Sequence, residues 1–154
     1  MATGVTLPAA APALAAPALA RLPGWEARLD VVVEAARHAP YALGRHDCAR
    51  FAGTCVAAVT GVDLWPQVGA YASRREAAQA IAAFGRDLAA AVSRLLGVDL
   101  VAPVLARRGD VVLYRDVEDH LGVCLGAQVA VLGPDGMAFV PITSPDVVGC
   151  WRVG

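Results

Sequence analysis

Cys48 occupies a position where a reactive thiol would be useful. It lies in the segment YALGRHDCARFAGTCVAAVTG, residues 41–61, where a polar turn meets an apolar run. This junction predicts the start of a helix, where free backbone N–H groups and the helix dipole stabilise a thiolate. We therefore expect the pKa of Cys48 to be lowered and the residue to act as a nucleophile. The alternative is an inert buried cysteine, which is the interpretation we give to Cys55, seven residues further into the apolar run.

A cysteine nucleophile needs a base, and two of the three histidines are weak candidates. His46 is only two residues from Cys48, so the two side chains can meet only if the turn folds back. His38 ends a predicted helix, where a protonated imidazole suits the dipole without a catalytic role.

The third histidine, His120, is the best candidate for the base. It begins a predicted strand in which the next residues on the same face are small, namely Gly122, Cys124 and Gly126. We expect a helix end to approach the sheet over this face and to bring Cys48 towards the imidazole. The alternative is a loop histidine beside Asp119 with a structural role.

The elements that would position these residues divide the chain into a helical half and a strand half. Hydrophobic periodicity, capping residues and glycine stops predict helices over 25–38, 47–60, 73–84 and 87–96. Alternating patterns then predict strands over 111–114, 121–125, 129–132, 137–142 and 147–153, with a hairpin turn at GPDG, residues 133–136. Helices followed by an antiparallel meander predict an α+β fold.

The composition limits the number of domains and the kinds of partner. The chain has 154 residues, of which 57% are hydrophobic and 18% charged, so we expect one domain in which a larger share of the surface than usual is either apolar or covered by a partner. The basic residues are all arginines and never form more than a pair, which argues against a nucleic-acid surface. No stretch predicts membrane insertion, and we expect all four cysteines to be reduced.

Residues 1–21 form an Ala/Pro-rich segment that we separate from the predicted domain at 22–154. The segment has no basic residue before Arg21, and prolines interrupt its apolar part, so we do not predict a secretion signal. We expect an extended arm that contacts a neighbouring subunit. The alternative is a disordered tail.

Three motifs in this order resemble the NlpC-type cell-wall peptidases, which are papain-like cysteine enzymes. They are YALGRHDCARF with its Asp47-Cys48 pair, RRGDVVLY with Gly109-Asp110, and DHLGVCLG with the element 120–123. The resemblance covers residue 22 to the C-terminus. More narrowly, HDC, GPDGMAFVPI and the closing Trp-Arg are similar to small relatives encoded in phage-tail and gene-transfer-agent clusters.

The resemblance implies a role for several residues and a fold in which helices pack on the sheet as in papain. Cys48 would be the nucleophile and His120 the general base, and Tyr41 would position the site or stabilise the oxyanion together with the Cys48 N–H. His46 and Asp47 are candidate substrate-binding residues. The substrate would be an amide of the peptidoglycan stem peptide, cleaved through a thioester without any cofactor. The family's third polar residue would fall near Leu132, which cannot orient an imidazole.

The sequence leaves three functions open. The first is a phage-tail cysteine peptidase that assists cell-wall penetration during DNA delivery, located in the virion tail tip or, before assembly, in the host cytoplasm. The second is a catalytically weak or inactive structural component of the tail tip, with the arm binding other tail-tip or hub proteins. The third is a metal site formed by His46, Cys48, His120 and Cys124, although the spacing is unlike that of common zinc sites.

Overall fold

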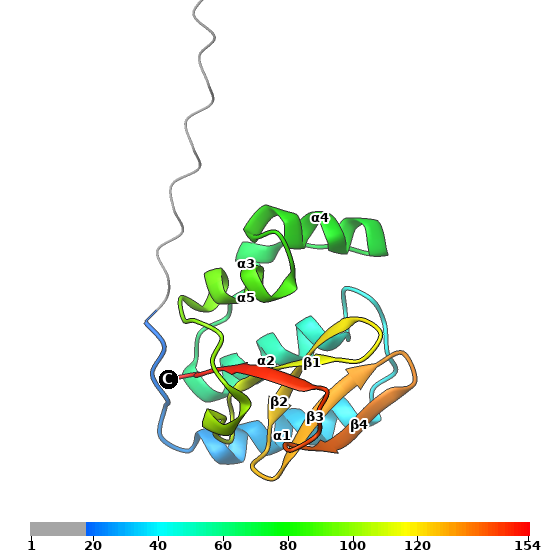
Figure 1. The fold of residues 1–154 in the computed structure, drawn as a ribbon. Coiled ribbons are helices and arrows are strands. Elements are labelled where there is room, and N and C mark those ends of the chain that lie inside the picture. The colour runs from blue at the N-terminus through cyan, green and yellow to red at the C-terminus, as the bar shows by residue number, and fades with distance from the viewer. Residues whose placement is uncertain (1–17) are drawn as a thin grey trace, which may run out of the picture.

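The fold is that of a helical layer packed on an antiparallel sheet, as the computed structural model in Figure 1 shows for residues 18–154, the part described. The helices come first: α1 (Trp25–His38), α2 (Cys48–Thr60), α3 (Trp65–Val68), α4 (Arg74–Phe84), α5 (Leu88–Leu96) and a 3-10 turn (Pro103–Leu105). The strands follow: β1 (Val111–Arg115), β2 (Asp119–Cys124), β3 (Gln128–Gly133), β4 (Gly136–Pro141) and β5 (Val147–Trp151). The predicted α+β class is confirmed.

The sheet is a meander with one added strand. Its order is β4-β3-β2-β1-β5, and each neighbouring pair is antiparallel. The predicted hairpin at GPDG is present, since β3 and β4 pair up to Gly133 and Gly136. The last strand, β5, pairs with β1 on the side opposite β2 and forms that edge of the sheet.

Helices α2, α4 and α5 begin directly after the capping residues that the sequence indicated. Asp47, Ser73 and Asp87 each accept a backbone N–H from the first turn of α2, α4 and α5. Gly61 and Gly97 end α2 and α5 in the left-handed conformation. The sequence did not predict α3 or the 3-10 turn, because one turn is too short for a hydrophobic period.

The main core lies between helices α1 and α2 and one face of the sheet (Figure 1). From the sheet it takes alternate residues of β1, β2 and β3, including Leu121 and Val123 of β2. Cys124 instead belongs to a second, smaller cluster with Val112, Val129 and Val131. The expected approach of a helix over the small face of β2 is therefore wrong: a side chain on Gly122 would meet Val129 and Val131 of β3. The helix packs on the Leu121 face.

A buried carboxylate joins the two ends of the described chain. Asp110, at the start of β1, is 0% exposed and accepts the backbone N–H groups of Arg107 and Val153, both at 2.8 Å. Its third partner is the guanidinium of Arg21 at 2.9 Å. Arg21 also donates to the carbonyls of Arg108 and Val153. The end of the predicted arm is thus bound to the domain, while residues 1–17 lie outside the described residues.

Among residues 18–154, no helix is long and apolar enough to cross a membrane.

Replacing Asp110 with alanine should destabilise the fold strongly. The change leaves Arg21 partly buried without its carboxylate, and the N–H groups of Val153, which is buried, and Arg107, which is partly buried, without an acceptor. We therefore expect the free energy of unfolding to fall by about 3–5 kcal/mol. Urea denaturation measures this. The control Asp99→Ala, at an exposed carboxylate, should change the same free energy by less than about 0.5 kcal/mol. A loss of under about 1 kcal/mol in Asp110→Ala would contradict the role assigned to this carboxylate.

Candidate active site

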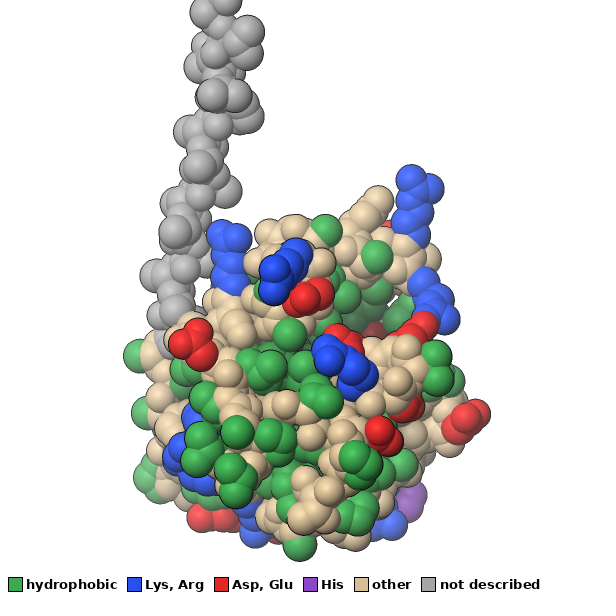
Figure 2. All heavy atoms as spheres, in the orientation of Figure 1, with side chains coloured by type: hydrophobic (Ala, Val, Ile, Leu, Met, Phe, Trp, Pro, Cys, Tyr) green, Lys and Arg blue, Asp and Glu red, His purple; other side chains and the backbone are tan. Residues whose placement is uncertain are grey.

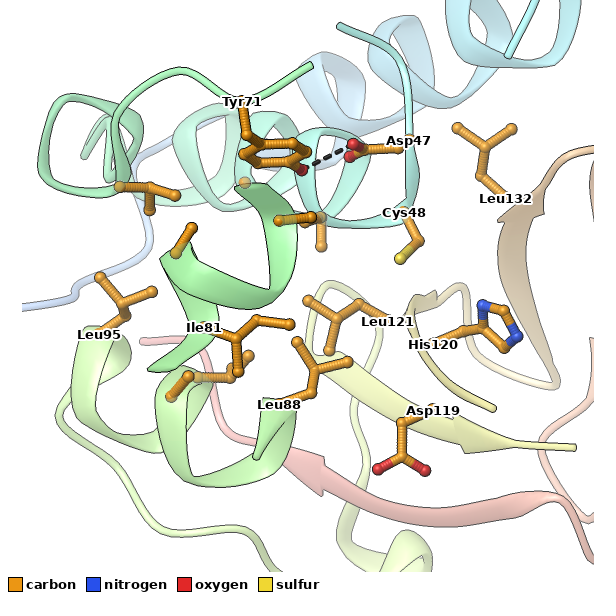
Figure 3. Close-up of a pocket in the computed structure, with 18 of the residues that line it drawn as sticks. Asp47, Cys48, Tyr71, Ile81, Leu88, Leu95, Asp119, His120, Leu121 and Leu132 are labelled. Carbon is orange, nitrogen blue, oxygen red and sulfur yellow. Dashed lines mark hydrogen bonds between the residues drawn. The ribbon is translucent and has the colours of Figure 1, made fainter. Parts of the chain in front are cut away.

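Cys48 is the first residue of α2, and its side chain points into a cavity. Figure 3 shows the sulfur directed from the helix start into the cavity, on the side where β2 lies. The residue before it, Asp47, is the N-cap of the helix and has the extended backbone of that position. The polar turn, the capping carboxylate and the apolar helix face therefore fix where the thiol lies.

Asp47 holds three segments together through its two carboxylate oxygens. Oδ1 accepts the backbone N–H of Arg50 at 2.8 Å, which caps the helix. Oδ2 accepts the N–H of Gly44 at 2.7 Å and the hydroxyl of Tyr71 at 2.6 Å (Figure 3). Only 3% of Asp47 is exposed, so each of these bonds replaces water that the carboxylate has lost.

Tyr71 is a site residue that the sequence analysis missed. It lies between α3 and α4, in no motif, and only its aromatic character in a polar loop could have drawn attention to it. Its backbone carbonyl passes so close to Gly44 that a Cβ there would lie 1.8 Å from the oxygen. Gly44 also has a φ of +79°, so glycine is required at this position for two reasons.

The cavity has a volume of about 600 Å³, within the usual range for ligand sites. One wall is formed by α3, α4 and α5, and the other by α2 from Cys48 to Val56 together with β2 and the end of β3. Figure 2 shows hydrophobic side chains in the hollow beneath α4. The lining includes the predicted residues Tyr41, Asp47, Cys48 and His120.

The pKa of Cys48 is raised, which is opposite to the expected direction. Burial of the thiol in this apolar cavity is the main cause, and the negative charge of Asp47 adds to it. The backbone N–H groups of Leu121, Ala49 and Cys48 favour the thiolate but do not compensate for burial. The helix start therefore supplies the expected donors, yet the free protein holds a neutral thiol.

The imidazole of His120 has a carboxylate partner that the sequence analysis also missed. Its Nε2 lies 3.2 Å from Oδ1 of Asp116, in the turn between β1 and β2. That contact leaves Nδ1 available to another group. Within the described part of the chain, no hydrogen bond joins His120 to Cys48, although both line the cavity. An Asp-x3-His spacing across a tight hairpin was the signal that could have identified Asp116.

The strand next to His120 supplies no orienting side chain. Leu132 is fully buried in the core and lines the cavity, as its apolar character predicts. The register pairs Gly122 with Val131, and continuing it by two residues brings Gly133 opposite His120. Asp119 is engaged elsewhere, with Arg115 at 2.6 Å. The position that could orient the imidazole from β3 therefore has no side chain.

Of the two other candidate residues, Tyr41 is part of the cavity lining and His46 is not. Tyr41 lines the cavity together with Cys48, and burial followed by the charges of Asp47 and Cys48 raises the pKa of its hydroxyl. His46 has its Nε2 3.1 Å from the carbonyl oxygen of Ala36 and is not part of the cavity lining. Cys124 lies in the smaller cluster on the other face of the sheet, so the four residues of the metal-site hypothesis are not brought together.

The comparisons with known proteins identify a family. Residues 20–153 match the family model described as a domain of unknown function, DUF6950. The chain belongs to this family. The DUF6950 match contains every residue of the candidate site and begins at residue 20, next to the Arg21 that binds Asp110. A search of curated proteins finds no match to the chain.

Removing the Tyr71 hydroxyl should show how far Asp47 stabilises this DUF6950 domain. Tyr71→Phe loses a short bond to a buried carboxylate, so we expect the free energy of unfolding to fall by about 1.5–3 kcal/mol. Tyr114→Phe is the matched control, because its hydroxyl makes a longer 3.3 Å contact with Asp146, and it should cost less than about 1 kcal/mol. Equal losses in the two variants, measured by urea denaturation, would argue against a special role for the Tyr71–Asp47 bond.

The raised pKa of Cys48 should appear in its alkylation. A thiol whose pKa lies above the ordinary 9.0 is mostly protonated at neutral pH, so iodoacetamide should modify Cys48 slowly at pH 7. The rate should rise roughly tenfold per pH unit and still be rising at about pH 9. Mass spectrometry of the modified peptide measures the rate, with Cys48→Ser as the blank. An inflection below about pH 7 would instead reveal a thiolate–imidazolium pair.

Proposed function

We propose that this DUF6950 protein is a cysteine hydrolase that cleaves an amide through Cys48, with an NlpC-like, papain-like arrangement of its helices and sheet. The observation that supports this most directly is the position of Cys48. It begins a helix packed on the sheet and faces a cavity that His120 and Tyr41 also line. A helix-borne thiol and a strand-borne imidazole around one cavity are what acyl transfer through a thioester requires.

In the proposed reaction, His120 accepts the thiol proton as the sulfur of Cys48 attacks the substrate carbonyl. The oxyanion that forms is stabilised by the backbone N–H of Cys48 and by the Tyr41 hydroxyl. The imidazolium then protonates the amine as the C–N bond breaks, which leaves a thioester on Cys48. Water, deprotonated by His120, attacks the thioester and releases the acid and the free thiol.

For this reaction to start, the thiol of Cys48 and the imidazole of His120 must come into hydrogen-bond contact, an arrangement that we call the closed state. His120 is held by Asp116 rather than by the thiol, and the thiol is neutral in the free protein. Catalytic contacts are often longer in ligand-free enzymes and shorten when the substrate binds. In the proposed closed state, Nε2 keeps its contact with Asp116 while Nδ1 turns to the sulfur, which would fix the tautomer of the base.

The substrate and biological setting come from the sequence resemblance. The three ordered motifs favour the stem peptide of peptidoglycan as the substrate, and the closing motifs favour a phage tail tip or gene-transfer agent. In this setting, the protein would open the cell wall locally during DNA delivery, and residues 1–21 would contact other tail-tip or hub proteins.

A second candidate function is a structural tail-tip component with weak or no catalysis. Two observations favour it: the raised pKa of the Cys48 thiol, and the absence, among the described residues, of a hydrogen bond between this thiol and His120. A protein with this role would keep the fold and the cavity but would not cleave the stem peptide.

Digestion of purified peptidoglycan sacculi separates the two functions. We expect the wild-type protein to release stem-peptide fragments, and both Cys48→Ser and His120→Ala to release at least about 100-fold less, because each removes one member of the dyad. His38→Ala is the matched control: this exposed histidine pairs with Glu34 on α1 and should leave the release unchanged. Mass spectrometry of the fragments identifies the bond.

Folding and substrate quality need their own controls. Circular dichroism should show that each variant keeps the wild-type secondary structure, and an established cell-wall hydrolase should digest the same sacculi. No release by a folded wild-type protein under these conditions would favour the structural function.

A further inference from the structure

The outer wall of the cavity, which is the wall that α4 forms, is unusual. Apart from Arg74, its lining side chains are apolar, and yet no residue of α4 is buried. This helix packs against α5. Ala77, Ala80, Ile81 and Phe84 form one stripe at helical spacing, and all four line the cavity. A stripe of this kind normally packs on a core, whereas here it faces the open space in front of α2 and β2.

The charged side chains that line this space already have partners. Asp47 accepts three hydrogen bonds, one of them from Tyr71. Arg74 and Glu118 pair with each other at 2.6 Å. Asp119 pairs with Arg115, and His120 contacts Asp116 through Nε2. The other ionisable side chains of the lining, Tyr41 and Cys48, lie at the end of the cavity next to Asp47.

The α4 stripe itself offers no hydrogen-bonding side chain, and this distinguishes between two kinds of apolar ligand. A peptide placed along the α4 stripe would give up water at each backbone N–H and C=O without gaining a partner, which is costly. An aliphatic chain has no such groups and gains from leaving water. Charge discriminates further, because Glu118 and Asp119 are paired with arginines, whereas Asp47, next to Cys48, has no ion-pair partner within residues 18–154 and disfavours an anionic head group.

We propose that the cavity binds the single aliphatic chain of a neutral amphiphile. The chain lies along the stripe formed by Ala77, Ala80, Ile81 and Phe84, and the head group lies at the end of the cavity that Cys48 and Tyr41 line. Figure 3 shows Ile81 of the stripe and Cys48 on the two sides of the cavity. This assignment goes beyond the proposed hydrolysis, because binding of the chain needs the cavity and not the thiol, and a head group bound at Cys48 would occupy the place of the substrate amide.

A fluorescence assay tests the proposal on the full chain. The neutral apolar dye N-phenyl-1-naphthylamine should brighten on binding to the wild-type protein, and dodecanamide should displace it. Ala80→Trp places a large ring in the stripe and should weaken the affinity for the dye at least tenfold. Ala82→Trp is the matched control, because Ala82 is an exposed residue of the same helix that does not line the cavity, and its affinity should equal that of the wild type.

Three further ligands and variants sharpen the test. Dodecanoate should displace the dye less well than dodecanamide, because its head group is anionic, and an acetylated, amidated trialanine peptide should not displace it. Cys48→Ser should bind the dye as the wild type does. This variant separates the two proposals, because loss of hydrolysis with retained binding leaves the chain-binding site intact.

The proposal is overturned by any of three results. The first is equal dye affinity in Ala80→Trp and Ala82→Trp, with both variants folded by circular dichroism. The second is displacement by the peptide but not by dodecanamide, which would assign the cavity to a peptide or protein segment. The third is a dimer, detected by light scattering, that does not bind the dye in the wild-type protein and that Ala80→Trp dissociates, which would assign the stripe to a second copy of the chain.

Discussion

The site depends on the burial of one carboxylate. Asp47 has lost nearly all its water, so it must be satisfied by donors from the protein, and these come from three separate segments: the turn at Gly44, the first turn of α2 and the loop at Tyr71. The carboxylate thereby fixes the start of the helix on which Cys48 lies and the loop that leads to α4. Both walls of the cavity are positioned by the same group, so the place of the thiol and the shape of the space in front of it are set together.

The same arrangement explains why the thiol is neutral. A helix start favours a thiolate only if the anion can be stabilised more strongly by the nearby amides than it was by water. Around Cys48 the amides are present, but the apolar side chains of the cavity exclude water and the charge of Asp47 opposes a second anion. A cavity that suits an apolar ligand is therefore a poor place for a permanent thiolate, and the proposed chemistry needs proton transfer to His120 at the time of reaction.

The sequence predicted what is encoded locally. The helices α1, α2, α4 and α5 and the five strands follow from hydrophobic periodicity, caps and glycine stops, each of which lies within a few residues of its effect. Tyr71 could not be found in this way, because it lies 24 residues from Asp47 and the path of the chain brings the two together. Asp116 is only four residues from His120, and its local spacing was a signal that the sequence analysis did not use. The raised pKa of Cys48 was missed for the same reason as Tyr71: the helix start is visible in the sequence, whereas the apolar wall formed by α4 is a consequence of packing.

The ion pair between Arg74 and Glu118 connects the outer wall of the cavity to the base. Glu118 lies in the same turn as Asp116, and its backbone N–H donates to the Asp116 oxygen that also contacts His120. A continuous series of contacts therefore runs from α4 through this turn to the imidazole. The pair is well exposed, so dissolved salt screens it. A rise in ionic strength should therefore weaken the Arg74–Glu118 pair, which is the link between α4 and the turn that holds His120, without a direct effect on the Cys48 thiol.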